Sequence, residues 1–209
     1  MASRTPFRVH PLKSKSQHHK YECCAVSGST VFIGTGDGSI VKYDVQRTAS
    51  GYECVGSNLA KTNAQRRPIQ QLAPIPELRM MLVLCDGTIM RLDLDELDTV
   101  VGSLRGVKEC TSFHLKKERG VFHLAGLTKR KTICIKEYRR DAEDLTFTRE
   151  QAVPDGARSV NWTGTHILVG FKKDYCLINV VDGTIKANVP FNKGTAPLVA
   201  NMDTMKEVV

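Results

Sequence analysis

The sequence predicts an all-β protein, a β-propeller built from four-stranded blades. Two observations lead to this prediction. Short apolar runs alternate with turn signals rich in Gly, Asp and Pro, which is typical of strands joined by tight turns. The pattern also repeats, because the third strand of each unit begins near Gly38, Gly87, Lys131 and Asp174, a period of about 45 residues. A β-sandwich or barrel would also give short strands, but not a fixed four-strand period.

The first two repeats are marked by Asp-Gly pairs, which between two strand patterns are strong hairpin signals. In the first repeat these are Asp37-Gly38, and in the second Asp86-Gly87. The strands expected in the first repeat are Tyr21–Val26, Thr30–Gly34, Ser39–Val45 and Gly51–Val55, before a polar loop at Ser57–Arg67. Those expected in the second are Ile69–Ala73, Met80–Leu84, Thr88–Leu94 and Thr99–Leu104.

The last two repeats carry basic turns between their second and third strands. The third repeat is expected to contain Cys110–Leu115, a turn at Lys116–Gly120, Val121–Leu124, a turn at Thr128–Lys131, Thr132–Tyr138 and Leu145–Thr148. The fourth is expected to contain Arg158–Trp162, Ile167–Val169, Cys176–Val181 and Thr184–Val189, with a charged break at Phe171–Asp174. Only Ala60–Gln65 and Asp141–Asp144 have a helical pattern, and both are short.

These elements divide the chain into a basic leader (1–20), a propeller segment (21–200) and a tail (201–209). The blades fall near residues 21–65, 68–105, 109–152 and 156–192. Propellers close with four to eight blades, and blades of this length more often come in sevens, which needs roughly 300 residues. The chain is therefore either a small closed ring or an open arc of a larger, seven-bladed propeller, and we favour the arc. Pro197–Ala200 has the pattern of a first strand of a further blade.

Composition indicates a soluble globular protein of the reducing cytosol. No apolar run has the roughly eighteen residues that a membrane helix needs, and the N-terminus has no secretory pattern. The seven cysteines are an odd number without a C-x-x-C pair, so no disulfides are expected. The net charge is +8, five of the basic residues lie in the leader, and the first acidic residue of the chain, Glu22, follows it. Such a leader is a solvated tail, a contact for phosphates or anionic lipid, or, on weaker grounds, a mitochondrial presequence.

The sequence indicates no enzyme, cofactor or metal site. Gly34–Gly38 lacks the spacing and the following helix of a phosphate-binding loop, so a hairpin turn is expected there. Cysteines and histidines lack metal-ligand spacing, and no nucleophile–base set is evident. A small hydrolase or transferase is the alternative from another class. Asn161–Thr163 matches a glycosylation acceptor by chance, and Trp162 is expected to pack between blades.

Two basic clusters occupy equivalent turns of successive blades and form the candidate site. Equivalent turns emerge on the same rim of a propeller, so one positive patch is expected, for an acidic protein surface or membrane phosphates. The alternative is that these are ordinary solvated turns. No aromatic residue is interleaved for base stacking, so nucleic acid is not expected as a partner. No small-molecule substrate is expected either. The proposed partner-binding rim consists of Lys129, Arg130, Lys131, Lys172 and Lys173.

Three groups of segments resemble citron homology (CNH) domains. In the second repeat, residues 68–78 (PIQQLAPIPEL) and 81–87 (MLVLCDG) resemble the second blade of that family. Residues 153–156 (VPDG) with 169–178 (VGFKKDYCLI) resemble its most recognisable segment. Residues 21–26 with 32–35 fit the first blade, so the resemblance covers about residues 21–200.

The resemblance implies a non-enzymatic protein-interaction scaffold. The match begins close to Met1, as in the tether subunits of the HOPS and CORVET complexes and in TGF-β-receptor-associated protein. It implies a role in vesicle-mediated protein transport and membrane fusion, with tether subunits and Rab-type small GTPases as partners. The location implied is cytoplasmic and peripheral on endosomal or lysosomal membranes. The alternative is a signalling adaptor that binds receptor tails or small GTPases. Such tether subunits continue into a helical solenoid and a zinc-binding region, so an isoform, a fragment or a partial gene model is expected.

Overall fold

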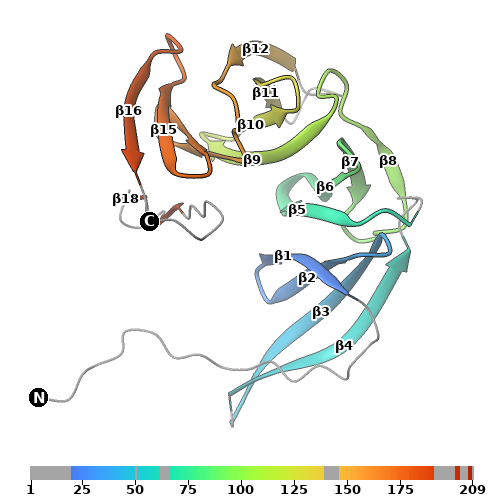
Figure 1. Ribbon diagram of the computed structural model, residues 1–209. Helices are drawn as coiled ribbons and strands as arrows, with labels where there is room; N and C mark the ends of the chain where they lie inside the picture. The colour runs from blue at the N-terminus through green and yellow to red at the C-terminus, as the bar shows by residue number, and fades with distance from the viewer. Residues whose placement is uncertain are drawn as a thin grey trace, which may run out of the picture.

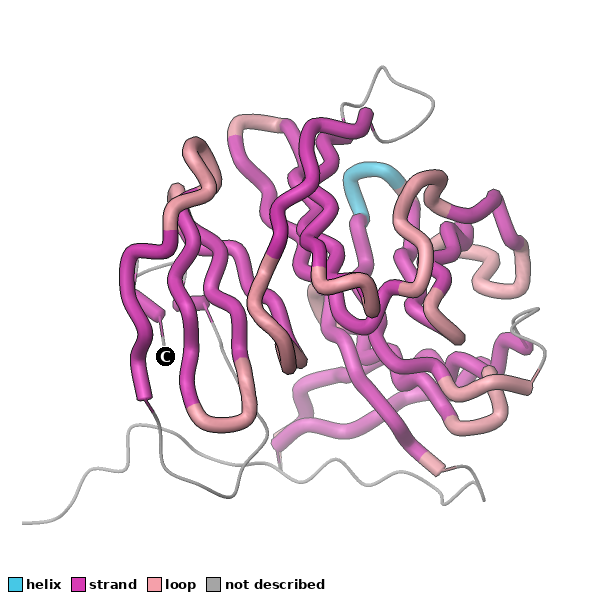
Figure 2. Tube along the Cα trace, turned by 45° about the horizontal axis from the view of Figure 1, so that its top comes forward, coloured by secondary structure: helices cyan, strands magenta, loops and turns pink. Residues whose placement is uncertain are grey.

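The computed structural model contains four four-stranded antiparallel sheets, which confirms the predicted all-β propeller fold with four blades (Figure 1). It describes residues 20–49, 51–61, 66–138, 146–190, 201–202 and 207–208. Each sheet is a simple meander in which neighbouring strands in the chain are neighbours in space. The described helical structure is the single 3₁₀ turn η1, Pro76–Leu78 (Figure 2).

The strands are six to eleven residues long in most positions, and each sheet is numbered from its inner to its outer strand. The first sheet contains β1 (Tyr21–Ser27), β2 (Thr30–Thr35), β3 (Ser39–Thr48) and β4 (Gly51–Lys61). The second contains β5 (Ile69–Ile75), β6 (Met80–Cys85), β7 (Thr88–Asp93) and β8 (Val100–Ser103). The third contains β9 (Cys110–Glu118), β10 (Val121–Thr128), β11 (Thr132–Tyr138) and β12 (Thr146–Ala152). The fourth contains β13 (Ser159–Thr163), β14 (His166–Gly170), β15 (Asp174–Asn179) and β16 (Ile185–Pro190), and β17 (Asn201–Met202) pairs with β18 (Glu207–Val208).

The sheets stand side by side in chain order and form an open arc. Strands β1, β5 and β9 lie on its inner side, whereas β4, β8, β12 and β16 lie on the outside (Figure 1). Contacts between sheets join each to the next, through β1 with β5, β5 with β9 and β9 with β13. The first and fourth sheets do not close a ring, as expected for a partial propeller (Figure 1).

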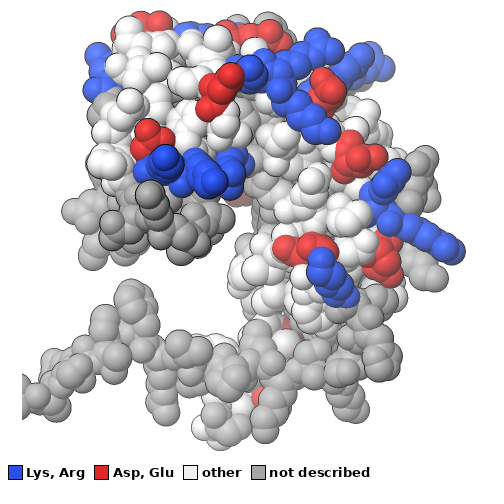
Figure 3. Space-filling view, in the orientation of Figure 1, with Lys and Arg blue, Asp and Glu red and all other residues white. Residues whose placement is uncertain are grey.

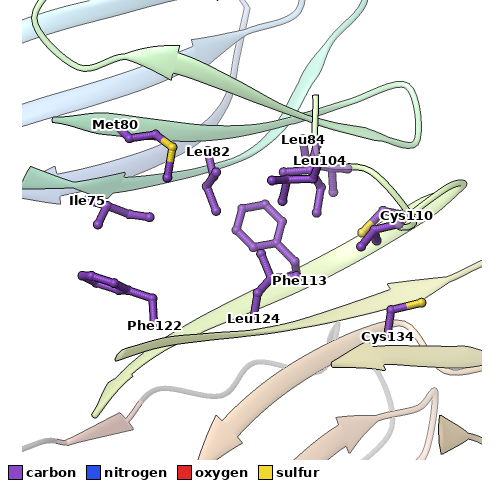
Figure 4. Close-up of a cluster of buried hydrophobic side chains, with 12 residues drawn as sticks. Ile75, Met80, Leu82, Leu84, Leu104, Cys110, Phe113, Phe122, Leu124 and Cys134 are labelled. Carbon is purple, nitrogen blue, oxygen red and sulfur yellow. The ribbon is translucent and has the colours of Figure 1, made fainter. Parts of the chain in front are cut away.

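Buried apolar clusters fill the three junctions between successive sheets. The middle junction is centred on Phe113, which lies between Leu82, Leu84 and Leu104 on one side and Phe122 and Leu124 on the other (Figure 4). Strand β6 is buried at every position because both faces of the second sheet are covered by neighbouring sheets. Burial of this kind contributes about 25 cal/mol per Å² of apolar surface, so the stacking of sheets, not any single sheet, stabilises the arc.

Side chains also fasten each inner strand to the next one. Cys23 donates its thiol hydrogen to the carbonyl oxygen of Ile69, at 3.3 Å. Gln71 binds both main-chain groups of Phe113, accepting from its N–H at 3.0 Å and donating to its carbonyl oxygen. His114 accepts through Nδ1 from the N–H of Trp162, at 3.1 Å. Inner strands have a free edge, and these bonds satisfy main-chain groups that would otherwise be buried without partners.

Several predicted boundaries are wrong. Strand β3 ends at Thr48 rather than Val45, β10 at Thr128 rather than Leu124, and β12 at Ala152 rather than Thr148, while β15 spans Asp174–Asn179 rather than Cys176–Val181. In two further places the expected turn, loop or helix is strand. Strand β4 continues to Lys61, where a polar loop from Ser57 and a helix from Ala60 were expected. It is an outer strand paired on one side only, so polar residues are tolerated in it. Strand β9 continues to Glu118, through the expected turn at 116–120, because residues 116–118 pair with residues 121–123 of β10, and Lys117 also forms an ion pair with Glu77 and lies over the Phe122 ring. The expected helix at 141–144, the strand at 197–200 and residues 1–19 lie outside the described residues.

Candidate functional site: a basic rim on the third and fourth sheets

The two basic clusters lie in the turns that join the second and third strands of their sheets. In the third sheet, Lys131 has a left-handed φ of 62°, and its N–H donates to the carbonyl oxygen of Thr128 at 3.1 Å. In the fourth sheet, the N–H of Phe171 donates to the carbonyl oxygen of Asp174 at 2.9 Å, which closes the turn around Lys172 and Lys173. Because both sheets are meanders of the same direction, both turns emerge on the same rim of the arc.

Two of the five basic side chains are paired with carboxylates. Arg130 contacts Glu109, with 3.2 Å between Nε and Oε2, and Lys131 forms an ion pair with Asp155. Within the described part of the chain, no carboxylate pairs with Lys129, Lys172 or Lys173. Basic and acidic side chains are accordingly interspersed over the surface, so the field is not uniformly positive (Figure 3).

Asp155 links the two clusters. It lies in the connection between β12 and β13, pairs with Lys131 of the third sheet, and lines a pocket of the fourth sheet of about 350 Å³. The pocket is an open hollow, and its lining includes Asp155, Phe171, Lys172, Lys173, Asp174 and Asn188. Lys131 therefore pairs with an acidic residue that lines the same pocket as Lys172 and Lys173.

The two acidic residues of this rim, Glu109 and Asp155, were not predicted from the sequence. Glu109 and Asp155 come from connections between sheets, so their proximity to the turns depends on how successive sheets stack. Main-chain hydrogen bonds also join these connections to the turn of the third sheet. The N–H of Lys129 donates to the carbonyl oxygen of Glu109, and the N–H of Val153 donates to the carbonyl oxygen of Lys131. The only sequence signal was Asp155-Gly156, which marks a turn just before the fourth sheet.

The pocket of the rim contains one cysteine, Cys176. Cys176, which lines the pocket, is 2% exposed, and burial, followed by the charge of Asp174, raises the pKa of its thiol. A protonated, buried thiol is a poor nucleophile. Among the residues that the structure describes, no group of three His, Cys, Asp or Glu side chains could hold a metal ion. The rim thus presents charges of both signs, and Phe171 lies beside Lys172 and Lys173.

The other motifs singled out in the sequence have structural roles in the fold. In the turn after β2, the Thr35 hydroxyl bonds both the N–H and the carbonyl oxygen of Ser39, at 2.9 and 2.8 Å. Trp162 is 5% exposed and packs between the third and fourth sheets, 5.3 Å from the His123 ring centroid. Asn161 is buried beside it, so the side chain that matches the glycosylation pattern is not accessible at the surface. No helix among the described residues has the length and apolar character to cross a membrane.

Comparison with protein families identifies this architecture. The family model of the CNH domain matches residues 27–208. The chain belongs to the CNH family. This confirms the family expected from the segments at 68–87 and 153–178. Curated relatives of this CNH domain include vacuolar sorting protein 39 of Arabidopsis thaliana, 26% identical over 182 residues, which are 84% of this chain and 18% of that protein.

A human relative is similar to this chain to about the same extent. The Vam6/Vps39-like protein of Homo sapiens is 26% identical over 204 residues, which cover 90% of this chain and 23% of that protein. This chain thus spans less than a quarter of the length of these two relatives.

Solved structures support the propeller fold alone. The WD40 domain of Neurospora crassa Pan2 superposes with a TM-score of 0.55 at 11% identity, covering 82% of this chain and 50% of that one. The computationally designed Ika8 protein superposes with a TM-score of 0.54 at 14% identity, covering 90% of this chain and 54% of that one.

Proposed function

We propose that this CNH domain is a non-enzymatic protein-interaction scaffold of the endosome–lysosome tethering machinery, acting in vesicle-mediated protein transport and membrane fusion. The observation that carries the proposal is the CNH match over residues 27–208, together with relatives named for vacuolar sorting. Partners would be tether subunits and Rab-type small GTPases, met at the cytoplasmic face of endosomal or lysosomal membranes. The arc would act by holding loops in fixed positions, because binding residues on loops are oriented by a rigid scaffold.

The basic rim is the proposed contact surface. Lys129, Lys172 and Lys173 have no carboxylate partner among the described residues, so their charges are available to an acidic surface. Phe171 lines the same pocket as Lys172 and Lys173 and offers an apolar contact. Rim charges of this kind act mainly on association rate and partner choice.

The test is direct binding of the purified 209-residue chain to purified HOPS and CORVET subunits and to Rab-type GTPases. The test variant is K172E/K173E, and the matched control is R119E/K186E, which makes the same charge change away from the rim turns. We expect the test variant to weaken binding about tenfold, equivalent to about 1.4 kcal/mol, and the control to change it less than twofold.

Two results would overturn the proposal at different levels. If the wild-type chain bound none of these proteins, or bound receptor cytoplasmic tails instead, the tethering role would be wrong. If both variants bound as tightly as the wild type, the role would stand but the rim would not be the contact.

A further inference from the structure

The turns and connections of the arc lie on two opposite rims. The turns between second and third strands lie beside the connections between sheets, because main-chain hydrogen bonds join them. The N–H of Cys110, at the start of β9, donates to the carbonyl oxygen of Gly87 at 2.8 Å, and the N–H of Arg158 donates to that of Gly170 at 2.8 Å. We call this side of the arc the connection rim. The remaining turns, at the other ends of the strands, form the opposite rim.

The two rims differ in charge. The described segments of the connection rim contain ten basic and four acidic residues, and all ten basic side chains are exposed. Five of them form the two basic clusters described above. The described turns of the opposite rim contain two basic and five acidic residues, and the turn at 139–145 lies outside the described residues. The other five basic residues of the connection rim are Arg66, Arg67, Arg105, Lys108 and Arg158.

The connection between β8 and β9 shows how the fold presents these charges. Leu104 and Val107 are buried in the middle junction, whereas their neighbours Arg105 and Lys108 are exposed. The main chain is held by Lys136, a buried residue whose ammonium group donates to the carbonyl oxygen of Arg105. Within the described part of the chain, no carboxylate forms an ion pair with Arg105 or Lys108. Both charges are therefore held at the surface and available to a ligand.

The basic leader joins the chain at the same rim. Lys20, its last residue, accepts through its carbonyl oxygen a hydrogen bond of 2.8 Å from the N–H of Gly36, in the turn between β2 and β3. Residues 1–20 contain five basic residues and no acidic one. The leader and the connection rim together carry more positive charge than the +8 of the whole chain, so the rest of the chain is net negative.

A continuous anionic layer fits this distribution better than one acidic peptide. The charges of the connection rim are spread from Arg66, before the second sheet, to Lys173 in the fourth, so a short peptide would meet only a few of them. Lipid headgroups can meet all of them at once, and each Lys or Arg near an anionic lipid surface strengthens binding about fivefold. The same layer would repel the opposite rim, which gives the contact one orientation.

We propose that the connection rim and the leader lie against an anionic membrane surface, with the opposite rim facing away from it. The inference rests on the proposed function only in placing the protein at membranes. The lipid and protein contacts use different parts of the rim. Lys172 and Lys173 line the pocket of the fourth sheet, whereas Arg66, Arg105 and Lys108 belong to the connections of the first three sheets.

Co-sedimentation of the intact chain with vesicles tests the lipid contact without any protein partner. We expect binding to vesicles of phosphatidylcholine and phosphatidylserine in equal parts, and none to phosphatidylcholine alone. R66E/R105E/K108E should weaken this binding about a hundredfold, since three contacts of about fivefold each are lost. The control R47E/R119E/K186E makes the same charge change outside the connection rim and should alter binding less than about twofold. Circular dichroism checks that both variants retain the strand signal.

Three results would overturn the proposal. Binding to neither kind of vesicle would exclude lipid as the ligand of this rim. Equal weakening by the two variants would show that net charge alone, and not the connection rim, is responsible. Loss of tether-subunit binding in R66E/R105E/K108E with unchanged vesicle binding would assign this surface to a protein partner. The tethering role is judged separately, by binding to purified tether subunits, so either proposal can fail while the other stands.

Discussion

Replacing Gln71 by alanine tests how the sheets are joined. Among the described side chains that join one inner strand to the next, Gln71 alone binds both the N–H and the carbonyl oxygen of one residue, Phe113. Phe113 itself is 1% exposed, so its main-chain groups lie where water is excluded. Q71A would leave both groups without their partner.

The cost follows from the number of bonds lost. A buried main-chain group left without a partner costs about 1–3 kcal/mol. Gln71 is half-buried, so some water can follow the truncation, and we expect the lower part of the range, about 2 kcal/mol in total. Local opening should become easier by the same amount, which corresponds to about thirtyfold faster exchange of the Phe113 amide hydrogen.

Hydrogen exchange followed by NMR measures that amide directly, and urea unfolding measures the loss of stability. Q70A is the matched control, since Gln70 is the adjacent residue of the same type and is exposed. We expect Q70A to leave both quantities nearly unchanged. Equal exchange rates for the Phe113 amide in Q71A and in the wild type would refute the reasoning that side chains fasten the inner strands.

Three further changes probe the cores and turns. Phe113→Ala should lower the free energy of unfolding by about 3–5 kcal/mol in urea titrations, because it empties the centre of the middle junction, and a loss below about 1 kcal/mol would contradict that packing. Burial raises the pKa of the Cys110 thiol to about 12, above the ordinary value of 9.0, so the folded state keeps a proton that the unfolded state loses. Stability should therefore fall between pH 9 and 12 by up to about 1.4 kcal/mol per pH unit, less steeply in C110A, and identical pH profiles would show that the thiol is not responsible. A Cβ added at Gly34 would lie 2.7 Å from atoms of Cys23 and Ile69, so G34A should cost about 1–3 kcal/mol in the same titrations, and an unchanged midpoint would contradict the close approach of the first two sheets.

The sequence predicted the elements that depend on local pattern. Asp86-Gly87 and residues 171–173 of the charged break lie between strands where expected, because turn chemistry and apolar alternation act over a few residues, although Asp174 already begins β15. The propeller itself was predictable because the repeat multiplies that weak local signal four times. Strand ends were not, since the continuation of β4 to Lys61 depends on pairing with β3 rather than on its own polar composition.

The candidate site was predictable only in part. Equivalent turns of meandering sheets emerge on one rim, and this placed Lys129–Lys131 and Lys172–Lys173 on the same side of the arc. Their partners Glu109 and Asp155 depend on how successive sheets stack, which no local pattern encodes. The same is true of Gln71, because its neighbour Gln70 has identical chemistry but sits at the irregular position of β5.

The salt dependence of binding tests the central proposal, a CNH scaffold that docks partners through a charged rim. Dissociation constants of the wild-type chain and of K172E/K173E for purified tether subunits would be measured between low and high salt. Exposed charges are screened within about 10 Å at 0.1 M ionic strength, so the wild-type affinity should fall as salt rises, and the slope should be much smaller in the variant. Binding with equal salt slopes in the two proteins, or no binding at any salt concentration, would contradict the account.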